Sequence, residues 1–252
     1  MTTDLTGLEV VLVIASVFAG ALVKSVTGMG FPLVAIPVMT LFLPTPVAVA
    51  VIALPNIAQN LVLVVRHRSA WRRTRSVAVF CAAGVPGAVI GAIALGSVPE
   101  SVVRGVLIVA LGAYLATTIA TPDFRISDAR AVRWSGPAGF VAGVFQGCIG
   151  ISGPVVGTWY HGMRLTQDGF VLSVATVFSL TGIAQASVLG ARGEFDGRLL
   201  VALSLTVVVF ATVPIGEAIR KRISVDRFRT IVLWLLAGSG ASLIVDLVRR
   251  LT

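Results

Sequence analysis

Long apolar segments, separated by short polar ones, constrain the fold of this chain more than any other feature. They cover residues 8–23, 46–65, 76–95, 105–120, 168–190, 199–219 and 230–245. Several approach the roughly 20 residues that a helix needs to cross the hydrocarbon core of a bilayer. Only 12% of the residues are charged, against about 25% in soluble domains. We therefore predict an all-α polytopic protein whose surroundings are a lipid bilayer.

The basic residues behind the net charge of +9 lie in short loops between the apolar segments. Basic loops of this kind set the orientation of membrane proteins, so we expect no nucleic-acid partner. The two cysteines and two histidines lack the spacing of a metal or redox motif, and we expect neither a bound metal nor a cofactor. The sequence also offers no nucleophile–base pair, so we do not expect an enzyme.

The chain contains an internal repeat. Residues 19–34 resemble 142–157, 56–60 resemble 182–186, 84–91 resemble 212–219, and 97–112 resemble 224–238. Because the four matches occur in the same order, we interpret the chain as a tandem duplication. The predicted boundaries are residues 1–120 for the first membrane repeat, 121–134 for a cytoplasmic linker and 135–252 for the second membrane repeat.

Loop charges indicate that the two repeats are inverted relative to each other. The loop 66–75 has five arginines and no acidic residue, whereas its counterpart 191–198 has two arginines and two acidic residues. The loop 96–104 carries no net charge, whereas its counterpart 220–229 has five basic residues and one acidic residue. Because positive loops stay in the cytoplasm, matching loops lie on opposite sides. This arrangement predicts a protein of the cell inner membrane with both termini on the outer, non-cytoplasmic side.

Each repeat is expected to open with a broken-helix hairpin and to continue with three transmembrane helices. The hairpins pair 8–27 with 30–43, and 135–150 with 153–163. The later spans are 46–65, 76–95 and 103–120 in the first repeat, and 167–190, 199–219 and 228–247 in the second. Three crossings after a hairpin give the odd number that inverted repeats require.

Two glycine-rich motifs, each followed by proline, interrupt the hairpins. They read KSVTGMGFP at 24–32 and QGCIGISGP at 146–154. We predict that each motif ends one helix and begins a shorter one, because proline suits the first turn of a helix. A new helix at membrane depth exposes free N–H groups and the positive end of its dipole, which favours an anion. The alternative is close packing between helices by the glycines of the motifs, Gly28, Gly30, Gly150 and Gly153.

Inverted repeats with interrupted helices at matching positions are typical of secondary transporters, which bind their substrate near the bilayer midplane. The paired glycine motifs followed by proline, the two-half organisation and the length of the chain resemble the TauE/SafE family of membrane permeases. The resemblance covers nearly the whole chain. It implies export or import of sulfite, sulfonates or related organosulfur anions.

Charged and hydroxyl side chains near the two motifs are candidates for contact with the anion. Lys24 is either its counter-charge or a lysine that reaches for the membrane interface. Ser25, Thr27 and Ser152 either donate hydroxyl hydrogens to the anion or bond to carbonyls of their own helices.

Amide side chains form a second group of candidates. Asn56, Gln59 and Asn60 share one helix face at a spacing of i, i+3 and i+4, and Gln185 is the repeat-related partner of Gln59. They either line a pathway or hydrogen-bond between helices. Gln146 lies beside the position that matches the lysine of the first motif, so the second repeat has no symmetric charge.

These features lead to the hypothesis of an inner-membrane secondary transporter that moves a small anion by alternating access. The resemblance points to a sulfur-containing anion such as sulfite or a sulfonate. A passive anion channel and a membrane accessory protein without transport activity are the alternatives. The sequence leaves open the direction of flux, a coupling ion such as H⁺ or Na⁺, and whether the protein forms an oligomer.

Overall fold

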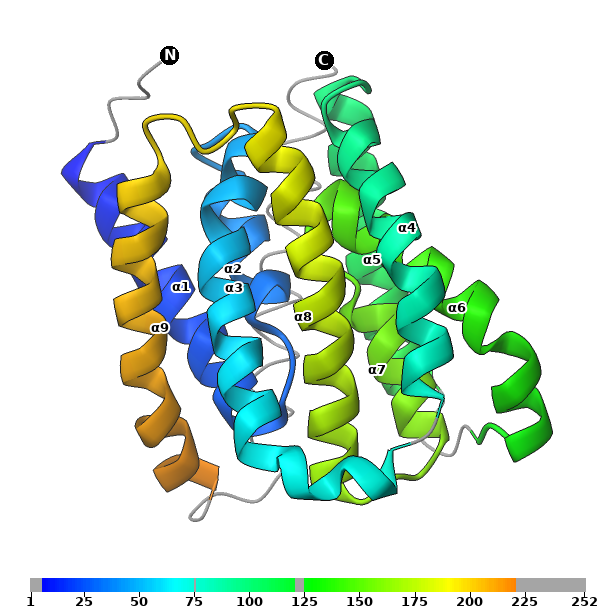
Figure 1. The fold of residues 1–252 in the computed structure, drawn as a ribbon. Coiled ribbons are helices and arrows are strands. Elements are labelled where there is room, and N and C mark those ends of the chain that lie inside the picture. The colour runs from blue at the N-terminus through cyan, green and yellow to red at the C-terminus, as the bar shows by residue number, and fades with distance from the viewer. Residues whose placement is uncertain (1–5, 75, 121–124, 221–252) are drawn as a thin grey trace.

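The computed structural model describes residues 6–74, 76–120 and 125–220, and every element in these ranges is helical (Figure 1). The elements are α1 (Gly7–Thr27), α2 (Phe31–Met39), α3 (Thr45–His67), η1 (Arg68–Arg73), α4 (Val77–Leu95), α5 (Glu100–Ala120), α6 (Asp128–Ile149), α7 (Gly153–Gly162), α8 (Gln167–Ala191) and α9 (Leu199–Arg220). The all-α prediction is confirmed for these residues. The predicted span 228–247 lies outside them.

The predicted segments match the observed helices closely, with two differences at their ends. The helix α2 ends at Met39, earlier than the predicted limit of 43, and a short turn joins it to α3. The helix α6 begins at Asp128 and not at 135, so part of the predicted linker is helical. Apolar periodicity alone missed this extension because three of its seven residues, Asp128, Arg130 and Arg133, are charged.

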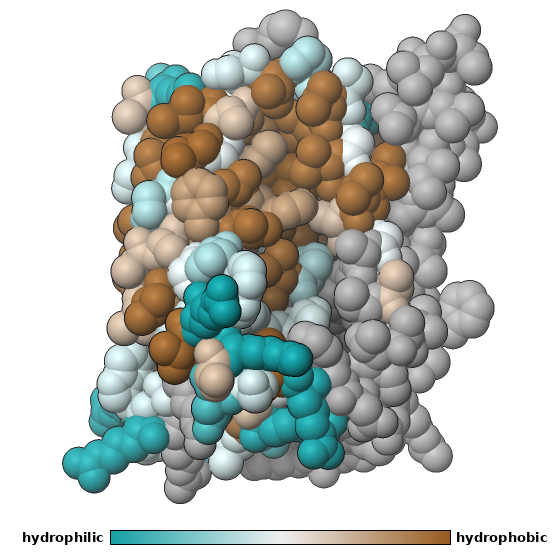
Figure 2. Space-filling view, turned by 90° about the vertical axis from the view of Figure 1, so that its right-hand side faces the viewer, coloured by the Kyte–Doolittle hydropathy of each residue, from teal (hydrophilic) through white to brown (hydrophobic). Residues whose placement is uncertain are grey.

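Five helices of the described ranges are long and apolar enough to cross a membrane. They are α1, α3 with its continuation to Arg72, α4, α8 and the Leu199–Gly216 part of α9. The helix α5 forms where a span was predicted but is not among the five. Figure 2 shows apolar side chains over much of one face, with hydrophilic side chains gathered towards one end. Such a surface suits contact with lipid and supports a multi-pass membrane protein.

Helices from the two halves of the sequence interleave in the fold. The helix α4 packs along α6, α9 packs along α1, and α3 packs against α8. The buried clusters of the described residues therefore draw on helices from both halves. The proposed repeat boundaries remain a prediction from the sequence.

Contacts at the helix ends fix the relative directions of the central helices. The Nδ1 atom of His67, at the end of α3, lies 3.0 Å from Oδ1 of Asp168, at the start of α8, so these two helices are antiparallel. At the opposite end, Arg192 after α8 donates to the carbonyls of Ala92 and Ile93 in α4 at 3.3 and 2.9 Å. Figure 1 shows the same arrangement, with α3 and α9 running against α8 and α4.

Glycines bring α4 and α6 into backbone contact. A Cβ atom added to Gly139, Gly143 or Gly147 of α6 would collide with backbone carbonyl oxygens of α4, including those of Gly84 and Ala88. This is the small-residue packing of membrane helices. Gly147, the last glycine of this row, belongs to the second glycine-rich motif, so the row fixes the position of that motif.

Candidate functional site

Glycines in the left-handed region create the two helix breaks, as predicted. Gly28 ends α1 with a φ of 86°, and its N–H donates to the carbonyl of Lys24. Gly30 follows with a φ of 111°. Gly150 ends α6 with a φ of 70°, and its N–H donates to the carbonyl of Gln146. Glycine adopts this conformation without the steric cost of a Cβ atom, which explains why each helix stops there.

A short helix starts immediately after each break. Gly30 precedes α2 and Ser152 precedes α7, and neither helix start has a side-chain capping hydrogen bond. Pro32 and Pro154 occupy the first turn of these helices, where the missing N–H removes no helical hydrogen bond. In α7 the N–H of Val155 donates to the carbonyl of Ser152 at 3.1 Å, so the N–H of Gly153 is the first-turn donor without an acceptor within the helix. In α2 the N–H groups of Phe31 and Leu33 are the corresponding donors. These N–H groups form two uncapped positive helix ends.

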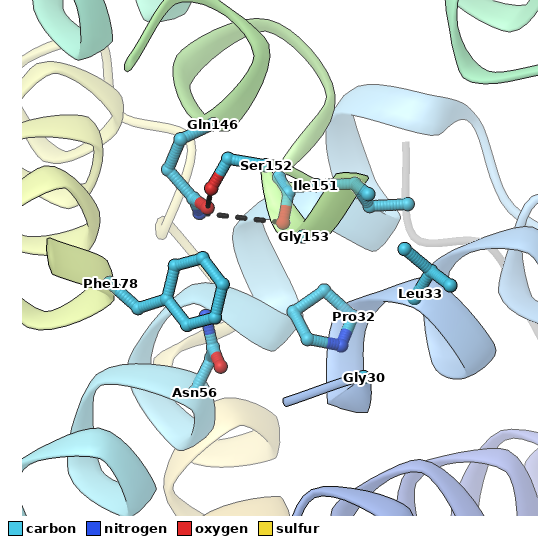
Figure 3. Close-up of a pocket in the computed structure, with 10 residues that line it drawn as sticks. Gly30, Pro32, Leu33, Asn56, Gln146, Ile151, Ser152, Gly153 and Phe178 are labelled. Atoms are coloured by element: carbon cyan, nitrogen blue, oxygen red, sulfur yellow. Dashed lines mark hydrogen bonds between the residues drawn. The ribbon is translucent and has the colours of Figure 1, made fainter. Parts of the chain in front are cut away.

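A small pocket lies between the two breaks (Figure 3). Its lining residues are Gly30, Pro32, Leu33, Asn56, Gln146, Gly150, Ile151, Ser152, Gly153 and Phe178. The volume open to the centre of a water molecule is about 10 Å³, which is close to the space that one water needs. The sequence-predicted residues divide evenly: Gly30, Asn56, Gln146, Gly150, Ser152 and Gly153 line this pocket, whereas Lys24, Ser25, Thr27, Gly28, Gln59 and Gln185 do not.

Lys24 lies directly behind the pocket wall. Its side chain is fully buried, its Nζ donates to Oδ1 of Asn56 at 2.6 Å, and it lies 5.6 Å from the centre of the Phe178 ring. In the described part of the chain, Asn56 is its one hydrogen-bond partner and no carboxylate pairs with it. The interpretation as a lysine that reaches the interface does not fit this geometry. A buried ammonium without a counter-ion is costly, and an anion in the pocket would compensate it.

The contact with Lys24 fixes the orientation of Asn56. An ammonium group can only donate, so the amide atom that faces it must be the oxygen. The Nδ2 atom of Asn56 therefore points away from Lys24, and it donates no hydrogen bond to any residue that the structure describes. Figure 3 shows this amide beside Phe178 at the edge of the pocket. Asn56 thus offers a free donor to a ligand.

A chain of amides forms the opposite wall. Gln185 Nε2 donates to the carbonyls of Gln146 and Gly147 at 2.6 and 3.1 Å. Gln146 Nε2 donates to Oε1 of Gln185 at 3.2 Å and, at 3.4 Å, to the carbonyl of Gly150. The hydroxyl of Ser152 donates to Oε1 of Gln146 at 2.8 Å. These bonds join α8, α6 and the start of α7 at the second break.

The first half has a related but incomplete arrangement. Gln59 Nε2 donates to the carbonyl of Ala21 at 2.9 Å and to Oγ of Ser25 at 3.0 Å. Its Oε1 is buried and accepts no hydrogen bond from the described residues. Ser25 also donates to the Ala21 carbonyl, and the hydroxyl of Thr27 lies within hydrogen-bond distance of the carbonyls of Val23 and Met29 and can donate to either. The hydroxyls of Ser25 and Thr27 are therefore engaged by backbone carbonyls, as the alternative interpretation expected.

Some lining residues were not predicted from the sequence. Phe178 belongs to the long apolar run of α8, where one aromatic residue gives no signal of a site. Leu33 and Ile151 are equally unremarkable in sequence, although their places beside the helix breaks could have indicated them. Within the described ranges, no three histidine, cysteine or acidic side chains gather as metal ligands.

A family model described as the sulfite exporter TauE/SafE matches residues 12–243, which include both breaks and the pocket. The chain belongs to the TauE/SafE family. Searches of curated proteins and of solved structures each found no match. Membership of TauE/SafE makes this protein a membrane transporter of the sulfite-exporter type and not an enzyme. A small anionic substrate and a membrane setting follow from the same membership.

Proposed function

We propose that this protein is a secondary transporter that binds sulfite or a sulfonate between the two helix breaks and carries it across the inner membrane by alternating access. One observation carries the proposal: the pocket lies between two uncapped helix starts, beside a fully buried lysine that has no carboxylate partner in the described chain. All three features favour a negative charge at the same place.

Lys24 acts on the pocket through Asn56. The ammonium polarises the amide by its contact with Oδ1 at 2.6 Å, and the free Nδ2 becomes a stronger donor towards the pocket. A bound anion therefore receives the effect of the lysine without displacing it. The amide also keeps the ammonium out of direct contact with the pocket.

The size of the pocket supports a transport cycle with more than one state. A pocket with room for about one water is too small for a sulfite or sulfonate group. Entry of the anion requires α2 and α7 to move apart from each other or from α3 and α8. Movement towards one side of the membrane and then the other is the alternating-access cycle of transporters with broken helices.

We further propose that the two halves are inverted repeats. The packing of α1 with α9 corresponds to the packing of α6 with α4, and α3 packs against its own counterpart α8. The antiparallel directions of α3 and α8, and of α4 and α9, support inversion (Figure 1). Gln59 and Gln185 also have matching contacts, because each holds a carbonyl near the end of the helix before the break.

The loop charges support an orientation with both termini outside. In that orientation the arginine-rich segment 66–75 faces the cytoplasm. Single cysteines introduced at Ser69 and at Ser97 would test it with a membrane-impermeant thiol reagent on intact cells. We expect labelling at 97 alone, and labelling at 69 alone would reverse the orientation.

Flux of sulfite into liposomes that contain the purified protein tests transport itself. We expect saturable uptake that is accelerated by sulfite on the opposite side, because a carrier with one alternating site exchanges faster than it returns empty. Flux that rises linearly and shows no such exchange would indicate a channel. Absence of flux for sulfite, sulfonates and small carboxylates would overturn the proposed function.

A further inference from the structure

The hydrogen bonds around the pocket have fixed directions, and these directions restrict the ligand. The starting point is a pair of backbone carbonyls, those of Gln146 and Gly147, which face the amide of Gln185 at 2.6 and 3.1 Å. A carbonyl can only accept, so the nitrogen of Gln185 must face them. Its Oε1 is then left to accept from Nε2 of Gln146 at 3.2 Å.

The orientation of the Gln146 amide in turn determines which way the hydroxyl of Ser152 points. With its nitrogen committed to Gln185, Gln146 presents Oε1 to the hydroxyl of Ser152 at 2.8 Å. A hydroxyl has one hydrogen, and Ser152 uses it on Gln146. Ser152 is only 2% exposed and lines the pocket. It therefore offers lone pairs, and no hydrogen, to a ligand.

The other wall has the opposite character. Lys24 forces the oxygen of Asn56 away from the pocket and leaves Nδ2 as a donor. The uncapped N–H groups at the starts of α2 and α7 are donors as well. The pocket thus combines several donors with a side-chain acceptor, Ser152 Oγ, whose direction is set by Gln146 and, behind it, by Gln185 outside the pocket.

A fully ionised oxyanion does not fit this pattern. It carries acceptors only, so one of its oxygens would meet the lone pairs of Ser152. Rotation of the hydroxyl would relieve that contact, but it would leave the buried Oε1 of Gln146 without its donor. Loss of such a buried hydrogen bond weakens binding by about tenfold or more.

We infer that the site selects a singly charged oxyanion that keeps a hydrogen-bond donor, such as singly protonated sulfite, over an anion of similar shape that has acceptors only. Gln185 is then a positioning residue, because it directs Gln146 and through it Ser152 without lining the pocket. The inference rests on the proposed function and narrows its substrate class.

Methylphosphonate and methanesulfonate test the inference as a matched pair. At a pH where methylphosphonate carries one negative charge, the two ions have the same charge and nearly the same shape, but only methylphosphonate has an O–H group. Competition of each ion against sulfite binding to the purified protein gives their relative affinities. We expect methylphosphonate to bind about tenfold or more tightly than methanesulfonate.

Gln185→Met tests the positioning role. Without the amide of residue 185, Gln146 can turn and Ser152 can direct its hydrogen into the pocket. The ratio of the affinities for the two ions should therefore approach 1, even if both affinities change. Thr181→Val is the control, because its hydroxyl bonds within α8 to the carbonyl of Val177. That variant should keep the preference of the unmodified protein.

Each outcome decides a different point. If sulfite binds but the unmodified protein binds both test ions equally, or prefers methanesulfonate, this inference is wrong and the proposed function stands. If neither test ion nor sulfite binds, the proposed function fails and the inference fails with it. A preference that persists in Gln185→Met would remove the positioning role, and the comparison in the unmodified protein does not depend on how that variant folds.

Discussion

Lys24 and Gln146 occupy equivalent places at the two helix breaks. Each is the residue whose carbonyl accepts the N–H of the left-handed glycine that ends its helix, Gly28 or Gly150. One position carries a buried charge and the other a neutral amide. The asymmetry suits a site for one anion, because a second buried lysine would repel the first and would need a second counter-ion.

Replacement of Lys24 by methionine should separate binding from stability. We expect sulfite affinity to fall by about 10- to 100-fold, because the anion loses the nearby positive charge and Asn56 loses the contact that orients its amide. The unfolding temperature without anion should stay the same or rise, because an uncompensated buried charge is removed. Thermal unfolding in detergent, with and without sulfite, measures both effects.

Arg192→Gln is the control for this change. It also removes one positive charge, but its side chain donates to carbonyls at the end of α4, away from the pocket. This variant should lose stability and keep its response to sulfite. An unchanged sulfite affinity in Lys24→Met would remove the lysine from the site.

Gly28→Ala should destabilise the first helix break. A left-handed conformation costs a residue with a Cβ atom roughly 1–2 kcal/mol, and the new Cβ would lie 3.0 Å from Cγ2 of Val171. Gly105→Ala in α5, where a Cβ meets nothing within 4 Å, should be neutral or slightly stabilising. Equal effects on the unfolding free energy of the two variants would contradict the role of Gly28.

The candidate residues could be predicted by type but not by orientation. Lysine, amides and hydroxyls inside apolar runs are expensive, so Lys24, Asn56 and Gln146 were visible in the sequence. Whether a hydroxyl faces a ligand or its own helix depends on rotation about the helix axis. Ser25 lies within α1 and donates to the carbonyl of Ala21, whereas Ser152 lies in the break before α7 and lines the pocket. Nothing in the sequence indicated that Phe178 lines the pocket, because aromatic residues are common in apolar helices.

Among the helices, the glycine contact between α4 and α6 was not predicted from the sequence. The motif at 84–91 was recognised as part of the repeat, and Gly143 as a match for Gly20. Their mutual contact depends on how distant segments pack. The lengths of the apolar segments predicted the helices well. They did not predict the start of α6, where Ser127 precedes the helix and Asp128 lies in its first turn.

Gly143→Ala should disrupt this contact. Its Cβ would collide with the carbonyl of Gly84 and lie 2.8 Å from the amide nitrogen of Ala88, so the helices must separate. We expect a loss of about 1–3 kcal/mol in unfolding free energy, as for other overpacked cores. Gly136→Ala is the matched control on the same helix, because a Cβ there meets nothing within 4 Å. Similar unfolding curves for both variants would contradict the close packing.

Glu100 at the start of α5 accepts a hydrogen bond from the start of α3, and the strength of this contact should depend on pH. Glu100 Oε1 accepts from the backbone N–H of Thr45 at 3.1 Å and pairs with Arg104 at 2.9 Å. Partial burial would raise the pKa of Glu100, but these hydrogen bonds outweigh it and hold the pKa below its ordinary value of 4.5. Glu100 precedes the apolar segment 103–120, at the helix end.

A lowered pKa in the folded state stabilises the protein above the unfolded value, and the contribution disappears as the pH falls through the folded value. Stability should therefore drop below a pH of about 4.5. Glu100→Gln should be less stable at neutral pH and should show a smaller drop in acid, whereas Asp196→Asn should keep the drop. Unfolding temperatures across this range provide the measurement, and an identical acid response in Glu100→Gln would contradict the contact.

For the molecule as a whole, the sequence predicts two related halves, but it does not predict that their helices interleave. Matching segments and loop charges indicated two related halves of opposite orientation. They carried no information on the pairing of α4 with α6 and of α9 with α1 across the halves. Each hairpin therefore packs against a helix from the other half: α1 against α9, and α6 against α4. Movement of one half relative to the other would therefore displace the helices that end at both breaks, which fits the proposed transport cycle.

The most direct test of the account is an experimental structure with the bound anion. Selenite, a heavier analogue of sulfite with a strong anomalous signal, would locate the site without ambiguity. We predict one peak between the two breaks, beside Asn56, Ser152 and Gly153, and its loss in Lys24→Met. A peak elsewhere, or none at a concentration that saturates sulfite transport, would contradict the account.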